Sequence, residues 1–295
     1  MKKHLSPKDL ARAIGVSESS LKRWADGGMI KGYRTAGGHR RIDLTEAIRF
    51  IRESEMPVRE PRLLGLSEVE GPLDAAQIPE DPTELLYQAL EQGESKKVRT
   101  ILTSMYLDGR GVADICDGPI RAAMSRLGEL WRHQSDGVLI EHRATDVCIS
   151  ALNLIRSMLP EPAESAPLAL GGAPPDDPYL LPSLMAATVM AAEGWRGFNL
   201  GPDCPTEVLI AAAKQTGARL VWISISAGQD EAELTRLLSR LADHLIVEGV
   251  DVVLGGRSLP HDVSLRRHNI HAIPSMSALA ALSRELVPAA VDRDG

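Results

Sequence analysis

The chain has 295 residues, enough for two or three domains of ordinary size. Hydrophobic residues make up 44% of it and charged residues 25%, which excludes global disorder, and no apolar run is long enough for a membrane span or a signal peptide. The three cysteines are far apart and form no CxxC pair, which excludes a disulfide framework and a zinc ribbon. We therefore expect a soluble protein of the cytoplasm without a membrane partner.

Positive charge is concentrated at the N-terminal end of the chain. Residues 1–56 contain 12 Lys or Arg and 7 Asp or Glu, a net charge of +5, whereas the remaining residues together carry −12. A basic N-terminal segment on an otherwise acidic chain predicts that only residues 1–56 contact a polyanion.

The N-terminal block, residues 1–56, carries the pattern of a helix-turn-helix. Ser6 is placed to cap a first helix that begins with proline, residues 15–16 make a tight turn, and Ser17 caps a second helix. The second helix would enter the major groove of DNA. Residues 33–42 then predict a hairpin around a Gly-Gly pair, whose arginines would contact phosphates.

The motif at residues 34–41, Arg-Thr-Ala-Gly-Gly-His-Arg-Arg, resembles the wing of the winged helix-turn-helix in the MerR family. The helix pair alone also occurs in proteins that bind no DNA, and the basic hairpin favours the DNA-binding interpretation. The resemblance implies binding to double-stranded promoter DNA as a homodimer or homotetramer, with RNA polymerase as a further candidate partner. The residues expected to contact DNA are Ser17, Ser19, Lys22, Arg23, Arg34, His39, Arg40 and Arg41.

The middle of the chain predicts a linker followed by a helical bundle. Residues 57–82 contain five prolines and no sustained periodicity, which is typical of a linker. From residue 83 to 160 the apolar pattern is helical, with glycines as stops. It predicts helices at 83–92, 95–107, 112–133 and 138–158. Four helices of this length with short loops form a four-helix bundle.

The C-terminal part, residues 167–290, alternates short apolar runs with amphipathic stretches after a second proline-rich linker. The predicted strands are 168–170, 198–200, 220–225, 252–254 and 270–273, and the predicted helices are 180–192, 206–215, 231–247 and 278–286. Buried strands that alternate with helices predict a flavodoxin-like α/β domain with a doubly wound parallel sheet. The fold class is therefore multidomain: a mainly α winged helix-turn-helix, a four-helix bundle and an α/β domain.

The predicted bundle contains Trp131 and, ten residues further on, Glu141 and His142. From their spacing alone, these are a core aromatic residue and two polar residues at a helix start. The order of a MerR-type head, a four-helix bundle and a parallel α/β domain resembles the cobalamin-dependent photoreceptor repressors of the CarH type. That resemblance implies that Trp131, Glu141 and His142 cap the upper face of adenosylcobalamin.

The loop after the first strand of the α/β domain matches this family unevenly. The family places an acidic residue, a histidine and a glycine there, and the histidine ligates cobalt. Here Asp177 matches the acidic residue, Tyr179 stands in place of the histidine and Pro182 in place of the glycine. A phenol is a poorer cobalt ligand than an imidazole. Cobalamin is therefore the expected cofactor, with weak or no binding.

The groove for the nucleotide tail of cobalamin matches the family better. Small residues follow the third and fourth strands, where open α/β sheets bind ligands: Ser224, Ser226, Gly255 and Gly256. The same residues are also explained as tight turns of a flavodoxin-like domain.

These features together predict a transcriptional regulator, a repressor by resemblance, and not an enzyme. No catalytic residue and no metal-ligating residue is expected. A cobalamin-linked and light-responsive sensor region would control oligomerisation or occupancy of DNA. Within regulation, the alternatives are a sensor for another tetrapyrrole and a repressor without a ligand. A corrinoid-carrying accessory protein of a methyltransferase is the alternative from another class, because such proteins combine the same bundle and α/β domain.

Overall fold

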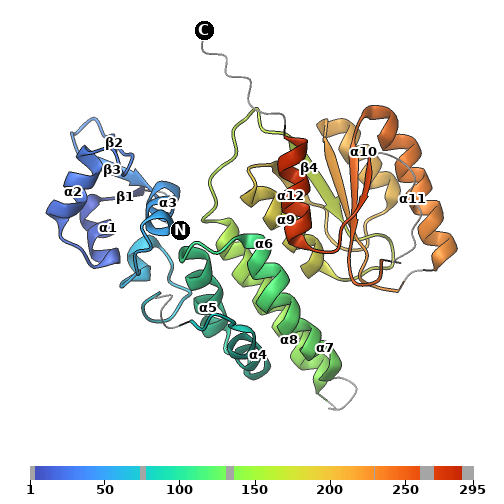
Figure 1. Cartoon of the computed structure of the whole chain (residues 1–295), viewed down its shortest axis with the longest axis horizontal. Helices are drawn as coiled ribbons and strands as arrows, with labels where there is room; N and C mark the ends of the chain where they lie inside the picture. The colour runs from blue at the N-terminus through green and yellow to red at the C-terminus, as the bar shows by residue number, and fades with distance from the viewer. Residues whose placement is uncertain (1–3, 74–77, 131–135, 229, 260–268, 288–295) are drawn as a thin grey trace, which may run out of the picture. The chain divides into compact units, whose positions relative to one another are not determined.

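The computed structural model describes residues 4–73, 78–130, 136–228, 230–259 and 269–287. The chain forms two compact units, Met1–Pro160 and Glu161–Gly295, and their elements are labelled in Figure 1. Within the described ranges, no helix combines the length and the hydropathy that crossing a membrane requires.

The first unit begins with three helices and a small antiparallel sheet. The helices are α1 Pro7–Ile14, α2 Glu18–Asp26 and α3 Leu44–Glu53, and the strands, in the order β1-β3-β2, are β1 His4–Leu5, β2 Tyr33–Arg34 and β3 Arg40–Asp43. The hydroxyl of Ser6 accepts a hydrogen bond from the backbone of Asp9, and that of Ser17 accepts one from the backbone of Ser20, each at 3.1 Å. Gly15 ends α1 in the left-handed conformation, with φ 76°. The predicted caps, turn and hairpin are therefore confirmed.

Part of the segment predicted as a linker is folded against these helices. The 3-10 helix η1, Pro61–Leu64, packs on α1. Val58 pairs with Leu73 in an antiparallel bridge, and Leu64 and Leu66 are fully buried. The prolines interrupt helical periodicity, but the apolar residues between them are still buried, because they pack against α1 and are removed from water there.

The bundle occupies the rest of the first unit. Its helices are α4 Thr83–Gln92, α5 Ser95–Leu107, α6 Val112–Ile115, α7 Arg121–Leu130 and α8 Gly137–Arg156. The predicted third helix is interrupted by a π-helical turn, Cys116–Ile120, which contains Pro119. Proline has no N–H for the helical hydrogen bond, so the helix widens by one residue there. The predicted four-helix bundle is confirmed, with α6, the π turn and α7 forming one of its four members.

Arg52, near the end of α3, connects the N-terminal block to the bundle. Its guanidinium lies over the ring of Tyr106, 4.0 Å from the ring centroid. It donates hydrogen bonds to the carbonyls of Tyr106, Gly109 and Arg110 at the end of α5. The carbonyl of Tyr106 also accepts from the backbone N–H of Gly109 at 3.2 Å. A cation beside the C-terminal end of a helix interacts favourably with the helix dipole. Burial raises the pKa of the Tyr106 phenol.

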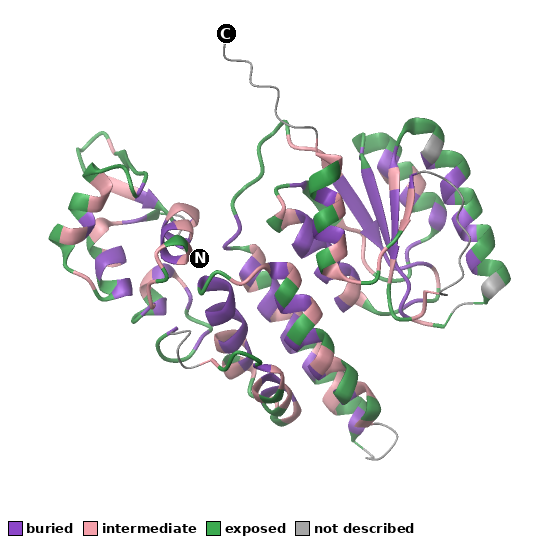
Figure 2. Cartoon of the chain, in the orientation of Figure 1, coloured by how far each residue is buried: buried purple, intermediate pink, exposed green. Residues whose placement is uncertain are grey.

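The second unit is a five-stranded parallel sheet with helices on both faces. The strands are β4 Leu168–Gly172, β5 Arg196–Asn199, β6 Leu220–Ser224, β7 Asp251–Gly255 and β8 Ile270–Ala272, and the helices are α9 Leu180–Ala192, α10 Thr206–Thr216, α11 Glu231–Leu245 and α12 Met276–Leu286. The strand order is β5-β4-β6-β7-β8, and the central strands are buried (Figure 2). The predicted doubly wound parallel sheet is confirmed.

The strand order determines where a ligand can bind in this unit. From β4 the chain passes first to β5, which pairs with one edge of β4, and then to β6, which pairs with the other edge of β4. Two neighbouring strands whose connections leave in opposite directions open a crevice at their carboxyl ends. The loops after β4 and β6 therefore border the expected ligand site of the sheet.

Candidate cofactor site and candidate nucleic-acid interface

The predicted cofactor-binding residues of the α/β unit meet at this carboxyl edge. Asp177 and Tyr179 lie in the loop between β4 and α9. Ser224 ends β6 beside Gly255, which ends β7. Ser226 follows two residues after the end of β6. The structure thus brings together residues that lie up to 79 positions apart in the sequence.

Asp177 joins two of these loops through hydrogen bonds to backbone amides. Its side chain is fully buried. One carboxylate oxygen accepts from the backbone of Ser226 at 2.5 Å and of Ala227 at 2.9 Å, and the other accepts from the backbone of Tyr179 at 3.1 Å. Three amide donors compensate a buried negative charge. Asp177 therefore positions the loops around the site.

Replacing Asp177 with asparagine is expected to lower the free energy of unfolding of the α/β unit by about 1–3 kcal/mol. An amide group keeps the shape of the side chain but directs N–H hydrogens toward backbone donors. Urea denaturation measures the change. Asp203→Asn is the matched control, because Asp203 accepts one backbone N–H in an exposed loop. Equal stability of D177N and the unmodified protein would contradict this role.

Tyr179 lies at the start of α9 with a cation on its ring. The residue is 37% exposed. The guanidinium carbon of Arg257 lies 4.8 Å from the centroid of the phenol ring. Arg257 follows Gly255 and Gly256 at the end of β7, and it is not among the site residues predicted from the sequence. The signal available in the sequence was a basic residue directly after a Gly-Gly pair at a strand end.

The residues at this edge fit the nucleotide end of a cobalamin better than they fit its cobalt. The hydroxyl of Ser226 is buried and has no hydrogen-bond partner in the described part of the chain. Gly256 has φ 118°, and a Cβ there would lie 2.0 Å from the carbonyl oxygen of Ile225, so only glycine is tolerated. Where the resemblance places a cobalt-ligating histidine, Tyr179 offers a phenol instead of an imidazole. His271 bonds to Asp251, at the opposite end of β7.

The predicted cap residues of the bundle are described only in part. Trp131 lies outside the described residues. Glu141 and His142 lie near the start of α8, as the sequence predicts, and their side chains approach each other at 3.6 Å. The side chain of His142 is 75% exposed and that of Glu141 is 25% exposed, so His142 lies at the surface of the bundle and Glu141 is partly buried.

Comparison with known protein families identifies the bundle. Residues 83–156 match a B12 binding domain. The matched residues run from the start of α4 to the end of α8, and the match indicates cobalamin as the ligand. It does not include residues 1–82. No curated protein matches the sequence.

Solved structures resemble the chain in fold. The monomethylamine corrinoid protein of Methanosarcina barkeri is 16% identical, with a TM-score of 0.54 over 69% of this chain and 97% of its own. A cobalamin-binding protein from Desulfitobacterium hafniense is 15% identical, with a TM-score of 0.36 over 70% and 98%. The methanol:cobalamin methyltransferase complex of Methanosarcina barkeri is 16% identical, with a TM-score of 0.36 over 71% and 81%. At these identities, the first likeness supports a shared fold and nothing finer.

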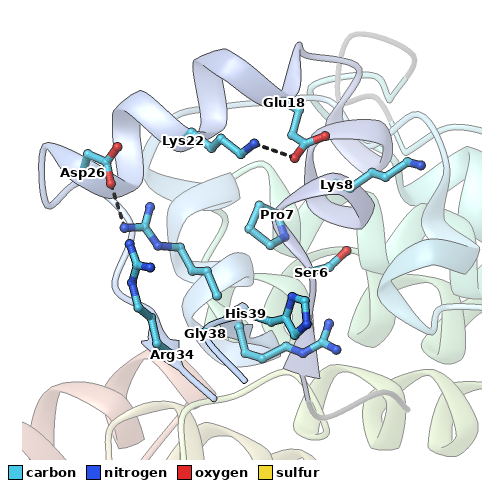
Figure 3. A pocket seen from close by; sticks show the side chains of 11 residues that line it. Ser6, Pro7, Lys8, Glu18, Lys22, Asp26, Arg34, Gly38 and His39 are labelled. Carbon is cyan, nitrogen blue, oxygen red and sulfur yellow. Dashed lines mark hydrogen bonds and ion pairs between the residues drawn. The ribbon is translucent and has the colours of Figure 1, made fainter. Parts of the chain in front are cut away.

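The N-terminal block contains a basic cavity of about 440 Å³ (Figure 3). Three elements form it: the start of α1, one face of α2 and the β2–β3 hairpin. The lining residues are Ser6, Pro7, Lys8, Glu18, Lys22, Asp26, Arg34, Gly38, His39, Arg40 and Arg41. Five of the eight residues predicted to contact DNA thus line one concave surface.

Two carboxylates neutralise part of this charge. Arg40 pairs with Asp26 at 2.7 Å, and Lys22 pairs with Glu18 at 3.0 Å (Figure 3). Lys8, Arg34 and Arg41 have no carboxylate partner among the described residues. The cavity therefore keeps an excess of positive charge.

The remaining predicted contacts lie outside this cavity. Ser17 caps α2, and its hydroxyl bonds to that of Ser19 at 2.8 Å. Arg23, also on α2, does not line the cavity. DNA contact by all eight residues stays a prediction.

Proposed function

We propose that the chain is a DNA-binding transcriptional regulator, a repressor, whose cobalamin-binding region controls its occupancy of promoter DNA. The basic cavity of the N-terminal block is the observation that carries this proposal. A single helix face presents Glu18, Lys22 and Asp26, and a hairpin with three arginines borders it. The major groove admits a helix of this kind, and arginines beside it reach phosphates on either strand.

Assembly belongs to the same proposal. One N-terminal block of this size covers a small stretch of DNA. Sequence-specific DNA-binding proteins commonly bind two half-sites as dimers. We infer that the protein acts as a homodimer or homotetramer, and RNA polymerase is the further partner expected at a promoter. Light scattering at micromolar protein should show more than one copy per particle, and a monomer with and without DNA would contradict the inference.

The test is selection of binding sites from a random double-stranded DNA library with the full chain. Enriched fragments are then titrated by fluorescence anisotropy without ligand, with adenosylcobalamin in the dark, and with the same complex after illumination. A specific enriched sequence whose affinity changes with cobalamin supports the proposal, and a further change on illumination supports the light response. No affinity for duplex DNA at low salt would overturn it.

The comparisons favour a second candidate, a corrinoid-carrying protein that serves a methyltransferase. The match of residues 83–156 to a B12 binding domain and the fold likeness to a monomethylamine corrinoid protein support it. Neither explains the basic cavity, and Tyr179 stands where this role needs a cobalt ligand. Tight cobalamin binding together with no DNA affinity would favour the carrier. We propose no catalytic residue for either function.

Asp26→Asn is expected to increase DNA affinity by about threefold at low salt. The substitution removes a negative charge from the cavity and releases Arg40 to contact phosphate. The ion pair is largely exposed on the side of Asp26, so its loss changes stability by at most about 1 kcal/mol.

Anisotropy titrations of D26N and of the control D108N give the comparison. Asp108 is an exposed acidic residue at the end of α5, so its substitution makes the same charge change away from the cavity. Weaker binding by D26N would instead mean that Asp26 holds Arg40 in its DNA-contacting position.

A further inference from the structure

Arg257 is held in place by two contacts that leave most of its donors unused. Its Nε donates to the backbone carbonyl of Ser226 at 3.0 Å, and its guanidinium lies against the ring of Tyr179. In the described part of the chain, no carboxylate pairs with Arg257 and no acceptor faces its two terminal nitrogens. The fork of the guanidinium is thus oriented at the carboxyl edge of the sheet and free to bind a planar or tetrahedral anion.

Ser226 supplies a second, independent sign of a missing ligand group. The residue is 3% exposed. Its backbone N–H donates to Asp177, and its carbonyl accepts from both Arg257 and the hydroxyl of Ser258, the latter at 2.8 Å. The Ser226 hydroxyl alone has no partner. A buried hydroxyl without a hydrogen bond is unfavourable, which is why nearly all such groups are paired in native proteins.

Asp177 is a carboxylate bonded to the backbone of Ser226, and its charge is already compensated. Its oxygens accept three backbone N–H groups, including that of Ser226. An anion that binds Arg257 and Ser226 therefore meets a guanidinium, a hydroxyl and a carboxylate that is largely screened by amide dipoles.

We propose that Arg257 and the hydroxyl of Ser226 form an anion site that binds the phosphodiester in the nucleotide tail of cobalamin. This inference rests on cobalamin binding by the α/β unit, as in the proposed function. It gives the tail a charged contact at the strand end that Gly255 and Gly256 form. Affinity would then depend on the tail and not on a protein ligand to cobalt.

The test compares cobalamin with cobinamide, which has the same corrin ring but lacks the nucleotide and its phosphate. Dissociation constants are measured by calorimetry for the full chain and for R257Q, R257K and R236Q. Arg236 on α11 is a matched control, because its Nε also donates to one backbone carbonyl and it has no ion pair in the described residues. R257Q should weaken cobalamin binding about tenfold and leave cobinamide binding unchanged. R257K should lose less affinity for cobalamin than R257Q, and R236Q should bind cobalamin as the unmodified protein does.

An equal effect of R257Q on both corrinoids, or no effect on either, would overturn the inference. So would a full chain that binds cobinamide as tightly as cobalamin. If neither corrinoid binds, the phosphate assignment fails as well, and ferric haem then tests whether Arg257 binds the carboxylates of a porphyrin. Failure of the proposed function is read separately, from the DNA titration without ligand, in which R257Q should bind DNA as the unmodified protein does.

Discussion

Replacing Arg34 and Arg41 together with alanine should weaken DNA binding at least about tenfold at low salt and lower the slope of log K against log[salt] by about 2. Both side chains line the basic cavity, and neither has a carboxylate partner among the described residues. Each that contacts a phosphate releases about one counterion. Anisotropy titrations at several salt concentrations measure both quantities.

The single variant R62A is the control for this experiment, since Arg62 is an exposed arginine of η1 that does not line the cavity. R40A should lose more DNA affinity than R62A and less than the double variant, because Arg40 is paired with Asp26 in the absence of DNA. An unchanged salt slope in the double variant would show that the hairpin does not contact the phosphate backbone.

Tyr179→His is expected to increase the affinity for cobalamin by about tenfold or more, equivalent to about 1.4 kcal/mol. An imidazole is a better ligand for cobalt than a phenol, and the loop that carries it is already held by Asp177. The absorbance of the corrin reports both binding and the identity of the axial ligand.

Tyr179→Phe separates coordination from packing, because it removes the hydroxyl but keeps the ring against Arg257. Y179F should bind cobalamin as the unmodified protein does. Tight binding by the unmodified protein with a cobalt–nitrogen spectrum would show that another histidine, and not residue 179, faces the metal.

Local pattern predicts most of the elements of this fold. The bounds of α4, α5 and α9 are the predicted ones, because each helix begins and ends at clear signals such as Gly93. The break in the third bundle helix at Pro119 could have been predicted from the proline itself. The folded part of residues 57–73 could not, since its burial depends on contacts with α1 that periodicity does not contain.

The candidate site was predictable where it follows strand ends and not where it depends on contacts between loops. Ser226 and Tyr179 lie at the carboxyl edge because parallel strands bring their ends together. The amides of Ser226 and Ala227 on Asp177, and the position of Arg257 over Tyr179, join segments about 50 to 80 residues apart, and no spacing in the sequence indicates such contacts.

The Arg52 contact has a consequence for the DNA that the protein can occupy. Arg52 bonds α3 to the end of α5, and part of residues 58–73, which connect the N-terminal block to the bundle, is itself folded against α1. The N-terminal block is therefore not joined to the bundle by a flexible linker alone. In an assembled protein the distance between two heads would then be set by the bundles. Tethered heads accept half-sites at many separations, whereas heads fixed in this way accept few. Inserting single base pairs between the half-sites of a selected operator should therefore reduce affinity steeply and restore it in part after a full turn of the double helix.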